Sequence, residues 1–103
     1  MSAEIEQLIE AIIDSDFDSI RTLLQRGVDP NGYLDDAKLR PLHFAAQYNA
    51  LEAAKLLITA GADISACTEP DRETPLAVAK LYNHKKFVDL LVRYVKKPHE
   101  LPN

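Results

Sequence analysis

Histidine and cysteine are the side chains of this sequence best suited to catalysis or metal binding, but their spacing favours neither. The three histidines, His43, His84 and His99, lie far apart, whereas zinc sites usually place two ligands within about five residues of each other. The single cysteine, Cys67, stands close before the acidic Glu69, and a catalytic thiolate needs a nearby base and positive surroundings. We therefore expect no metal site and an inert thiol at Cys67.

The carboxylates and glycines indicate no catalysis either. Asp14, Asp16 and Asp18 alternate along a polar stretch, which is typical of a solvated corner with one helix N-cap rather than of a paired acid and base. The chain contains only three glycines, and none lies in a phosphate-binding loop. We expect no catalytic residue and no cofactor, and therefore a protein that is not an enzyme.

Composition and net charge narrow the class of protein. The 103 residues, 47% of them hydrophobic, suit one small domain with its own core. The net charge of −4 argues against nucleic-acid binding. No run approaches the roughly 20 apolar residues of a membrane span. One cysteine excludes an internal disulfide, and the N-terminus lacks the basic start of a signal peptide, so we expect a cytoplasmic location.

The charges divide unevenly along the chain. Residues 1–36 contain nine Asp and Glu but only two Arg, whereas residues 37–103 contain seven acidic and ten basic residues. The acidic half favours a partner with a basic surface. The basic C-terminal end is either a solvated cap or a docking patch for an acidic partner, and both interpretations stay open; its residues are Lys80, Lys85, Lys86, Arg93, Lys96 and Lys97.

The sequence repeats itself at one fixed offset. The coincident triplets are Leu8, Leu42 and Leu76, then Ala11, Ala45 and Ala79, then Leu23, Leu57 and Leu91. Gly27 likewise falls on Gly61, and Asp29 on Asp63. Shared residues at one offset in three copies indicate an internal repeat, and such units are stable only when they stack on one another.

Each copy has the pattern of two short helices. In the middle copy, Pro41 suits a first helical turn, and Leu42 and Ala45 follow on one helical face. Asn49 predicts a break between the two helices, because asparagine tolerates the left-handed backbone that ends a helix. A second helix is predicted over 51–59.

The outer copies repeat this pattern. The third copy has Thr74 as N-cap, Pro75 in the first turn and Asn83 as the break. In the first copy, Asp16 is the predicted N-cap of the second helix.

These motifs resemble those of the ankyrin-repeat family. The matching stretches are Pro41-Leu42-His43-Phe44-Ala45-Ala46, residues 56–63 with their Gly61-Ala62-Asp63 ending, and Thr74-Pro75-Leu76-Ala77-Val78-Ala79. The resemblance implies an all-α solenoid of helix–turn–helix units joined by short β-turn fingers. The implied single domain, 1–103, has repeats at about 4–34, 35–68 and 69–97 and a tail at 98–103. The first repeat is expected to be the N-terminal cap, with Glu6, Glu10 and Asp14 on its polar outer face, and the third the C-terminal cap.

Several residues depart from the family pattern. Arg40 replaces the usual threonine, so an N-cap hydroxyl is missing there. Lys80 replaces a buried alanine and Val95 a closing glycine, as suits a capping repeat with one face in water; the last helix is then expected to run to Lys97 before Pro98. The resemblance also implies structural roles for His43 and His84, with His43 hydrogen-bonded to a neighbouring turn.

By the same resemblance, the finger tips and the outward sides of the first helices line a concave groove that binds another protein. Interfaces favour exposed aromatic residues and arginine. Tyr48 and Tyr82 occupy equivalent repeat positions and are expected to form an aromatic ladder in this groove. The predicted partner-binding residues are Asp36, Lys38, Leu39, Arg40, Gln47, Tyr48, Asp71, Arg72, Glu73, Leu81 and Tyr82.

The expected function is that of a non-catalytic protein–protein interaction module. We expect the chain to be a monomer when free and to bind neither nucleic acid nor membrane. The alternative is a dedicated small inhibitor or immunity-type protein that blocks one toxin or enzyme. An adaptor is expected to bind several proteins, whereas an inhibitor binds one partner tightly.

Overall fold

The computed structural model describes residues 2–96 and contains six α-helices in that range. No strand occurs among the described residues, which confirms the all-α prediction. The helices are α1 (Ser2–Ile13), α2 (Phe17–Gln25), α3 (Pro41–Gln47), α4 (Leu51–Thr59), α5 (Pro75–Leu81) and α6 (Lys85–Lys96). Each repeat contributes one consecutive pair. Helix α4 covers the range predicted for it, and Lys97 and Pro98 lie outside the described residues.

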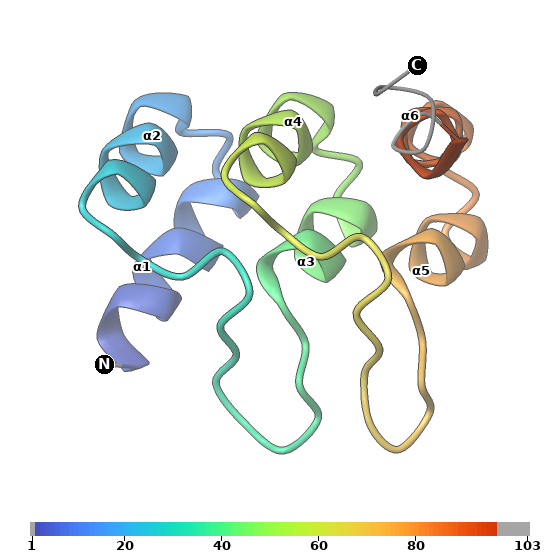
Figure 1. The fold of residues 1–103 in the computed structure, drawn as a ribbon, viewed down its shortest axis with the longest axis horizontal. Helices are drawn as coiled ribbons and strands as arrows, with labels where there is room; N and C mark the ends of the chain where they lie inside the picture. Colours follow the sequence, from blue (N-terminus) through green and yellow to red (C-terminus); the bar gives the residue numbers. More distant parts are fainter. Residues whose placement is uncertain (1, 97–103) are drawn as a thin grey trace.

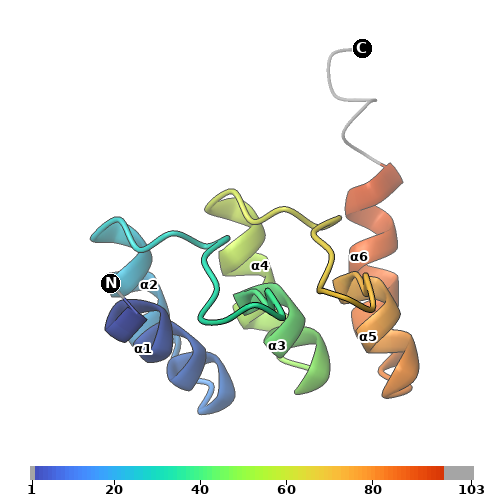
Figure 2. The ribbon, with the colours of Figure 1, turned by 90° about the horizontal axis from the view of Figure 1, so that it is seen from below.

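The helices form two rows (Figure 1). The inner row is α1, α3 and α5, in which each helix packs against the next, and the outer row is α2, α4 and α6. Two long loops, one between α2 and α3 and one between α4 and α5, extend from the inner row away from the outer row. These loops are the predicted fingers, and from below they lie in front of the inner helices (Figure 2).

The backbone repeats with the same period as the sequence. Ser15, Asn49 and Asn83 all have positive φ, between 55° and 62°, and each ends the first helix of its repeat. Gly27 and Gly61 have φ of 98° and 106° and end the outer helices α2 and α4. Residues with side chains rarely adopt this left-handed backbone, and asparagine tolerates it best after glycine. Both predicted asparagine breaks are confirmed.

The helix N-termini show which caps the sequence predicts correctly. The Asp16 carboxylate accepts hydrogen bonds from the Ser19 N–H at 3.2 Å and the Ser19 hydroxyl at 2.7 Å. Thr74 Oγ1 accepts from Ala77 N–H at 3.1 Å. Both predicted N-caps are therefore confirmed. Arg40 supplies no such acceptor, as expected.

The core is built from the recurring apolar residues. Leu8, Leu42 and Leu57 are almost completely buried, and so are the small Ala45 and Ala54. Alanine at such positions lets neighbouring helices approach closely, while leucine supplies most of the buried area. Outer-face residues of the first repeat, including Glu6, Glu10 and Asp14, are exposed, as predicted for a capping repeat, and Lys80 is likewise exposed at the other end.

Candidate functional site

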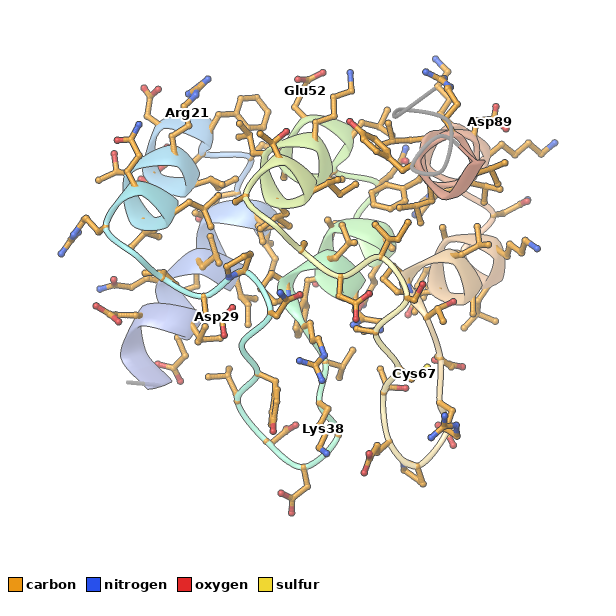
Figure 3. All side chains as sticks on the ribbon, in the orientation of Figure 1. Arg21, Asp29, Lys38, Glu52, Cys67 and Asp89 are labelled. Atoms are coloured by element: carbon orange, nitrogen blue, oxygen red, sulfur yellow. The ribbon has the colours of Figure 1, made fainter. Side chains whose placement is uncertain are left out.

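The two fingers are connected to each other. The first comprises residues 33–40 and the second residues 67–73. Glu69 N–H donates to the Ala37 carbonyl at 2.8 Å, and Lys38 Nζ lies 3.3 Å from a Glu69 carboxylate oxygen. Figure 3 places Lys38 at the far end of the first finger, on the opposite side of the molecule from Arg21 and Glu52 of the outer helices. The finger tips are thus held side by side by one backbone bond and one exposed ion pair.

Each finger is also closed internally, and both turn at the same repeat position. Lys38 and Arg72, which coincide at the repeat offset, have φ of 57° and 56°. The second finger is closed by Thr68, whose N–H donates to the Glu73 carbonyl at 2.9 Å and whose hydroxyl accepts from Glu73 N–H at 3.0 Å. These bonds define the backbone of the second finger and leave the Asp71 and Arg72 side chains exposed.

Arg40 lies at the base of the first finger and anchors it. Its Nη1 donates to the Asn31 carbonyl at 2.6 Å, and its guanidinium lies 5.0 Å from the centre of the Tyr33 ring. Lys38 Nζ lies over the same ring at 5.8 Å. A cation near an aromatic face is attracted by the ring quadrupole. Arg40, predicted to be a partner-binding residue, therefore has its charged group engaged within its own finger.

Asn31 connects this base to the second repeat. Its amide Nδ2 donates to the Gly61 carbonyl at 3.1 Å, and its Oδ1 accepts from Asp63 N–H at 2.7 Å. The side chain thereby satisfies two backbone groups of the turn that follows α4. The first finger is consequently held at its base by Arg40 and Asn31.

The other predicted site residues lie at the ends of the inner helices. Gln47 and Leu81 are the last residues of α3 and α5, and Tyr48 and Tyr82 follow them directly. Both tyrosines are about half exposed, and Leu81 is 70% exposed. Leu39 of the first finger is only partly exposed.

The exposed large hydrophobic side chains of the described residues all lie on the fingers or the inner-helix ends. Among residues 4–94, whose burial the structure describes, none lies on the outer helices. The six are Ile13, Tyr33, Leu34, Tyr48, Leu81 and Tyr82. We call residues 33–40, residues 67–73 and the helix-end residues Ile13, Gln47, Tyr48, Leu81 and Tyr82 the candidate interaction surface.

Ile13, Tyr33 and Leu34 are not among the predicted site residues. Ile13 coincides with Gln47 and Leu81 at the repeat offset. The repeat alignment therefore already indicated that Ile13 shares the position of two predicted site residues. Tyr33 and Leu34 follow the polar turn of residues 29–32, and a neighbouring pair of apolar residues in a finger carries no periodic signal.

The predicted tyrosine ladder takes a different form in the structure. Tyr82 stacks on His84, with ring centres 6.1 Å apart and ring planes inclined by 16°. His84 Nε2 in turn donates to the Gln47 carbonyl at 3.0 Å. No ring-to-ring contact of Tyr48 occurs within residues 2–96. The two tyrosine positions are therefore connected through His84 rather than through direct stacking.

His43 is a buried structural histidine. Its Nδ1 accepts from Arg40 N–H at 3.1 Å, so Nε2 carries the proton and donates to the Glu73 carbonyl at 2.8 Å. Burial lowers the pKa of His43, because the charged imidazolium is poorly solvated there. The predicted hydrogen bond to a neighbouring turn is confirmed, and it extends from α3 to the second finger.

Cys67 and the carboxylates are the remaining reactive groups of residues 2–96. Cys67 Sγ lies 3.6 Å from the Ser65 carbonyl. No cluster of three histidine, cysteine or acidic residues suited to a metal ion occurs among residues 2–96. A hydrogen bond from Ser19 lowers the pKa of the exposed Asp16, as its capping role requires. No helix within this range is both long and apolar enough to cross a bilayer.

Comparison with known proteins identifies the family. A family model of ankyrin repeats in three copies matches residues 8–100. The chain is 31% identical over 86 residues to the ARF GTPase-activating protein Git of Drosophila melanogaster and 39% identical over 72 residues to the human ankyrin repeat and SOCS box protein 16. It is 35% identical over 86 residues to the potassium channel GORK of Arabidopsis thaliana. The chain belongs to the ankyrin-repeat family.

These relatives are much longer than this chain. The alignments cover 84%, 70% and 82% of the present sequence but only 12%, 16% and 10% of the respective relatives. The similarity is therefore to one segment of each. Ankyrin repeats generally act as non-catalytic protein–protein interaction modules.

Proposed function

We propose that this chain binds a partner protein through the candidate interaction surface. The observation that supports the proposal is the distribution of the six exposed large hydrophobic side chains, all of which lie on that surface. Buried aromatic side chains supply much of the affinity of protein interfaces. The fingers and helix ends are held by hydrogen bonds within and between repeats. Little backbone ordering is then left to occur when Tyr48, Tyr82 and Leu81 meet a partner, which reduces the entropic cost of association.

The charges of the fingers favour a partner with a basic surface. Residues 33–40 and 67–73 contain five carboxylates and three cations. Two of the cations are already engaged, Lys38 with Glu69 and Arg40 with Tyr33. The fingers therefore carry more carboxylates than cations, and a partner with a positive surface would be drawn to them over a distance of about a Debye length.

The test is partner capture with a double variant. The purified full chain, the Tyr48→Ala plus Tyr82→Ala variant and a control variant are each used as bait in a lysate of the source cells. If each tyrosine contributes on the order of 2 kcal/mol to binding, removing both should weaken binding several hundred-fold. Loss of captured protein with the tyrosine variant supports the proposal, and undiminished capture overturns it.

The control changes an outer helix. Glu52 and Lys55 are exposed on α4, carry opposite charges and lie 3.3 Å apart. The Glu52→Ala plus Lys55→Ala variant therefore keeps the net charge while altering two outer-helix sites, and it should capture partners as the unchanged chain does. The number of captured proteins separates an adaptor from the inhibitor alternative, since an inhibitor yields one stoichiometric partner.

A further inference from the structure

The stack of repeats ends in two faces, one formed by α1 and α2 and the other by α5 and α6, at opposite ends of the longest axis (Figure 1). An open hollow of about 440 Å³ lies on the α1–α2 face, and one of about 400 Å³ lies on the α5–α6 face. Each hollow is lined by residues of a single repeat. The two hollows are therefore the places where the stacking of repeats stops in the part of the chain that the structure describes.

The α1–α2 face carries a carboxylate at a position that is covered in the other repeats. Glu10 coincides at the repeat offset with Phe44 and Val78. Glu10 is exposed, whereas Phe44 is half-buried and Val78 is buried. Among the described residues, the second and third repeats each have a repeat packed before them. This position therefore faces the preceding repeat.

The α5–α6 face carries lysines at positions where the other repeats have apolar side chains. Lys80 is exposed, whereas Ile12 and Ala46, which coincide with it at the repeat offset, are fully buried. Lys85, the first residue of α6, is also exposed and coincides with the partly buried Leu51. Since Ile12 and Ala46 belong to the repeats that have another repeat after them, the position of Lys80 faces the following repeat.

The two hollows have opposite charge. The first is lined by four carboxylates and one arginine, and the second by two lysines and one carboxylate. No ion pair of Glu10, Asp14, Lys80 or Lys85 occurs within residues 4–94. A terminal repeat needs only a polar outer face to stay in solution, whatever its sign. Opposite signs at the two ends exceed that requirement and make the two faces complementary.

Each hollow also has apolar side chains between its charges. Ala11 and Leu23 line the first, and Ala79 and Val88 line the second. Val88 is partly exposed, whereas Ala54 at the same repeat position is fully buried beneath the next repeat. An apolar centre with a polar rim is the usual arrangement of a protein interface.

We propose that copies of this chain associate head to tail, with the α5–α6 face of one copy stacked on the α1–α2 face of the next. Helix α5 then packs beside α1 of the next copy and α6 beside its α2, as α3 packs beside α5 and α4 beside α6 within one chain. Lys80 meets Glu10 of the next copy, because the first position faces the following repeat and the second faces the preceding one. Lys85, at the start of α6, lies toward Asp16 at the start of the next copy's α2.

This arrangement goes beyond the proposed function and gives the basic C-terminal end an acidic partner, the N-terminal end of another copy. The two faces differ, so the contact is heterologous and leaves one face of each kind free at the ends of an assembly. Association can therefore continue beyond a dimer. The monomer expected from the sequence is then the form present at low concentration.

The first test is sedimentation equilibrium of the full chain at concentrations up to about 1 mM, which detects a dissociation constant in the millimolar range. At low salt the weight-average mass should rise steadily with concentration, without a plateau at the mass of a dimer. In 1 M salt, where the Debye length is about 3 Å, the association constant should fall at least about tenfold. A mass that stays monomeric at low salt, or that rises equally at both salt concentrations, would overturn the proposal.

Charge reversal tests the pairing of the two faces. The Glu10→Lys plus Asp14→Lys variant has two positive faces, and the Lys80→Glu plus Lys85→Glu variant has two negative faces. Each variant alone should stay monomeric at low salt, whereas their equimolar mixture should associate, because every contact then joins opposite charges. Either variant associating alone as strongly as the unchanged chain, or a mixture that stays monomeric, would contradict the arrangement. The salt series uses the unchanged chain and decides the question even where a variant fails to fold.

The control for net charge lies on the outer helices. Arg21 and Lys55 are exposed, coincide at the repeat offset and line neither hollow. The Arg21→Glu plus Lys55→Glu variant changes the net charge by the same amount as Lys80→Glu plus Lys85→Glu, yet it should still associate. Loss of association in this variant would assign the effect to net charge and overturn the proposed pairing.

The variant Tyr48→Ala separates this association from the proposed function. Tyr48 belongs to the candidate interaction surface and lines neither hollow, so its replacement should leave self-association unchanged. If Tyr48→Ala abolishes self-association while the charge-reversed variants keep it, copies meet through the candidate interaction surface, and the head-to-tail arrangement is wrong. Failure of lysate capture would overturn the proposed function alone, since different residues carry the two proposals.

Discussion

His84 of the third repeat donates from Nε2 to the carbonyl oxygen of Gln47 in the second repeat at 3.0 Å. The acceptor belongs to the last turn of α3, where backbone carbonyls have no partner within the helix. The same imidazole stacks on Tyr82. One side chain thus satisfies a helix end, joins two repeats and supports a residue of the candidate interaction surface.

Replacing His84 by alanine should therefore affect stability and binding together. Loss of one partly buried hydrogen bond and of the stacked ring should lower the free energy of unfolding by about 1–2 kcal/mol. The freed Tyr82 ring should also weaken capture of the partner, whereas a Gln25→Ala control at an exposed position of α2 should change neither. Urea denaturation with a parallel binding titration measures both effects. Unchanged binding would show that Tyr82 does not need this support.

The buried His43 makes stability depend on pH. Its pKa is lowered in the folded protein by burial, so between the unfolded pKa of about 6.5 and the lower folded value the unfolded chain binds more protons. The contribution of neutral His43 to the free energy of unfolding should consequently be fully present above about pH 7. The free energy of unfolding should then decline as the pH falls below about 6.5. Urea denaturation at pH 7.5, 6.5 and 5.5 measures this decline.

The variant His43→Ala identifies the source of that dependence. It leaves the Arg40 N–H and the Glu73 carbonyl without their partner, which should cost about 2–4 kcal/mol at pH 7.5. Its free energy of unfolding should then fall less steeply between pH 7.5 and 5.5 than that of the unchanged chain. An identical slope in both proteins would assign the pH dependence to other groups.

Removing the third repeat should unfold the remainder. Deletion of residues 69–103 takes away α5 and α6, exposing buried His43, Ala46 and Leu57. Repeat arrays need roughly three units for stability. Circular dichroism should show a loss of helix well beyond the share of the deleted residues. A cooperative thermal transition near that of the full chain would contradict this expectation.

The left-handed position between α1 and α2 offers a stabilising substitution. Ser15 has a φ of 57°, while the equivalent residues of the other repeats are Asn49 and Asn83. Asparagine adopts this backbone more readily than serine, so Ser15→Asn should raise the free energy of unfolding by about 0.5 kcal/mol. Asn83→Ala should lower it by a comparable amount or more. Thermal melts should show a higher melting temperature for Ser15→Asn and a lower one for Asn83→Ala than for the unchanged chain.

Association with the partner should slow as salt rises. Steering by the acidic fingers acts over a Debye length of about 10 Å at 0.1 M salt. Stopped-flow measurements at low and high salt should show a steep fall in the association rate constant for the unchanged chain. Asp35→Asn plus Asp36→Asn should flatten that fall. A rate constant independent of salt would show that the acidic residues do not steer the association with the partner.

The periodic features of the fold could be predicted because each leaves a local mark in the sequence. Asp16 and Thr74 as N-caps, Asn49 and Asn83 as breaks, and the range of α4 all follow from backbone requirements that act over a few residues. The shared repeat offset then places these elements in equivalent positions, and stacking follows from their apolar faces.

The contacts of the fingers could not be predicted in the same way. The position of Arg40 over Tyr33 depends on how a finger of irregular backbone folds back on itself, and no periodicity encodes such a contact. The stacking of Tyr82 on His84 rather than on Tyr48 likewise depends on ring orientations. The surface was identifiable from the sequence as a set of positions, whereas the engagement of individual side chains required the structure.

The bonds that Asn31, His43 and His84 make to a neighbouring repeat all end on backbone atoms, at Gly61 and Asp63, Glu73 and Gln47 respectively. Every amino acid supplies a carbonyl group, and every one except proline supplies an N–H. Partly exposed residues such as Gln47 can therefore be exchanged during evolution without removing an acceptor that holds the stack together. New specificities can arise at such positions at little cost in stability, because the backbone half of each of these bonds is independent of side-chain identity.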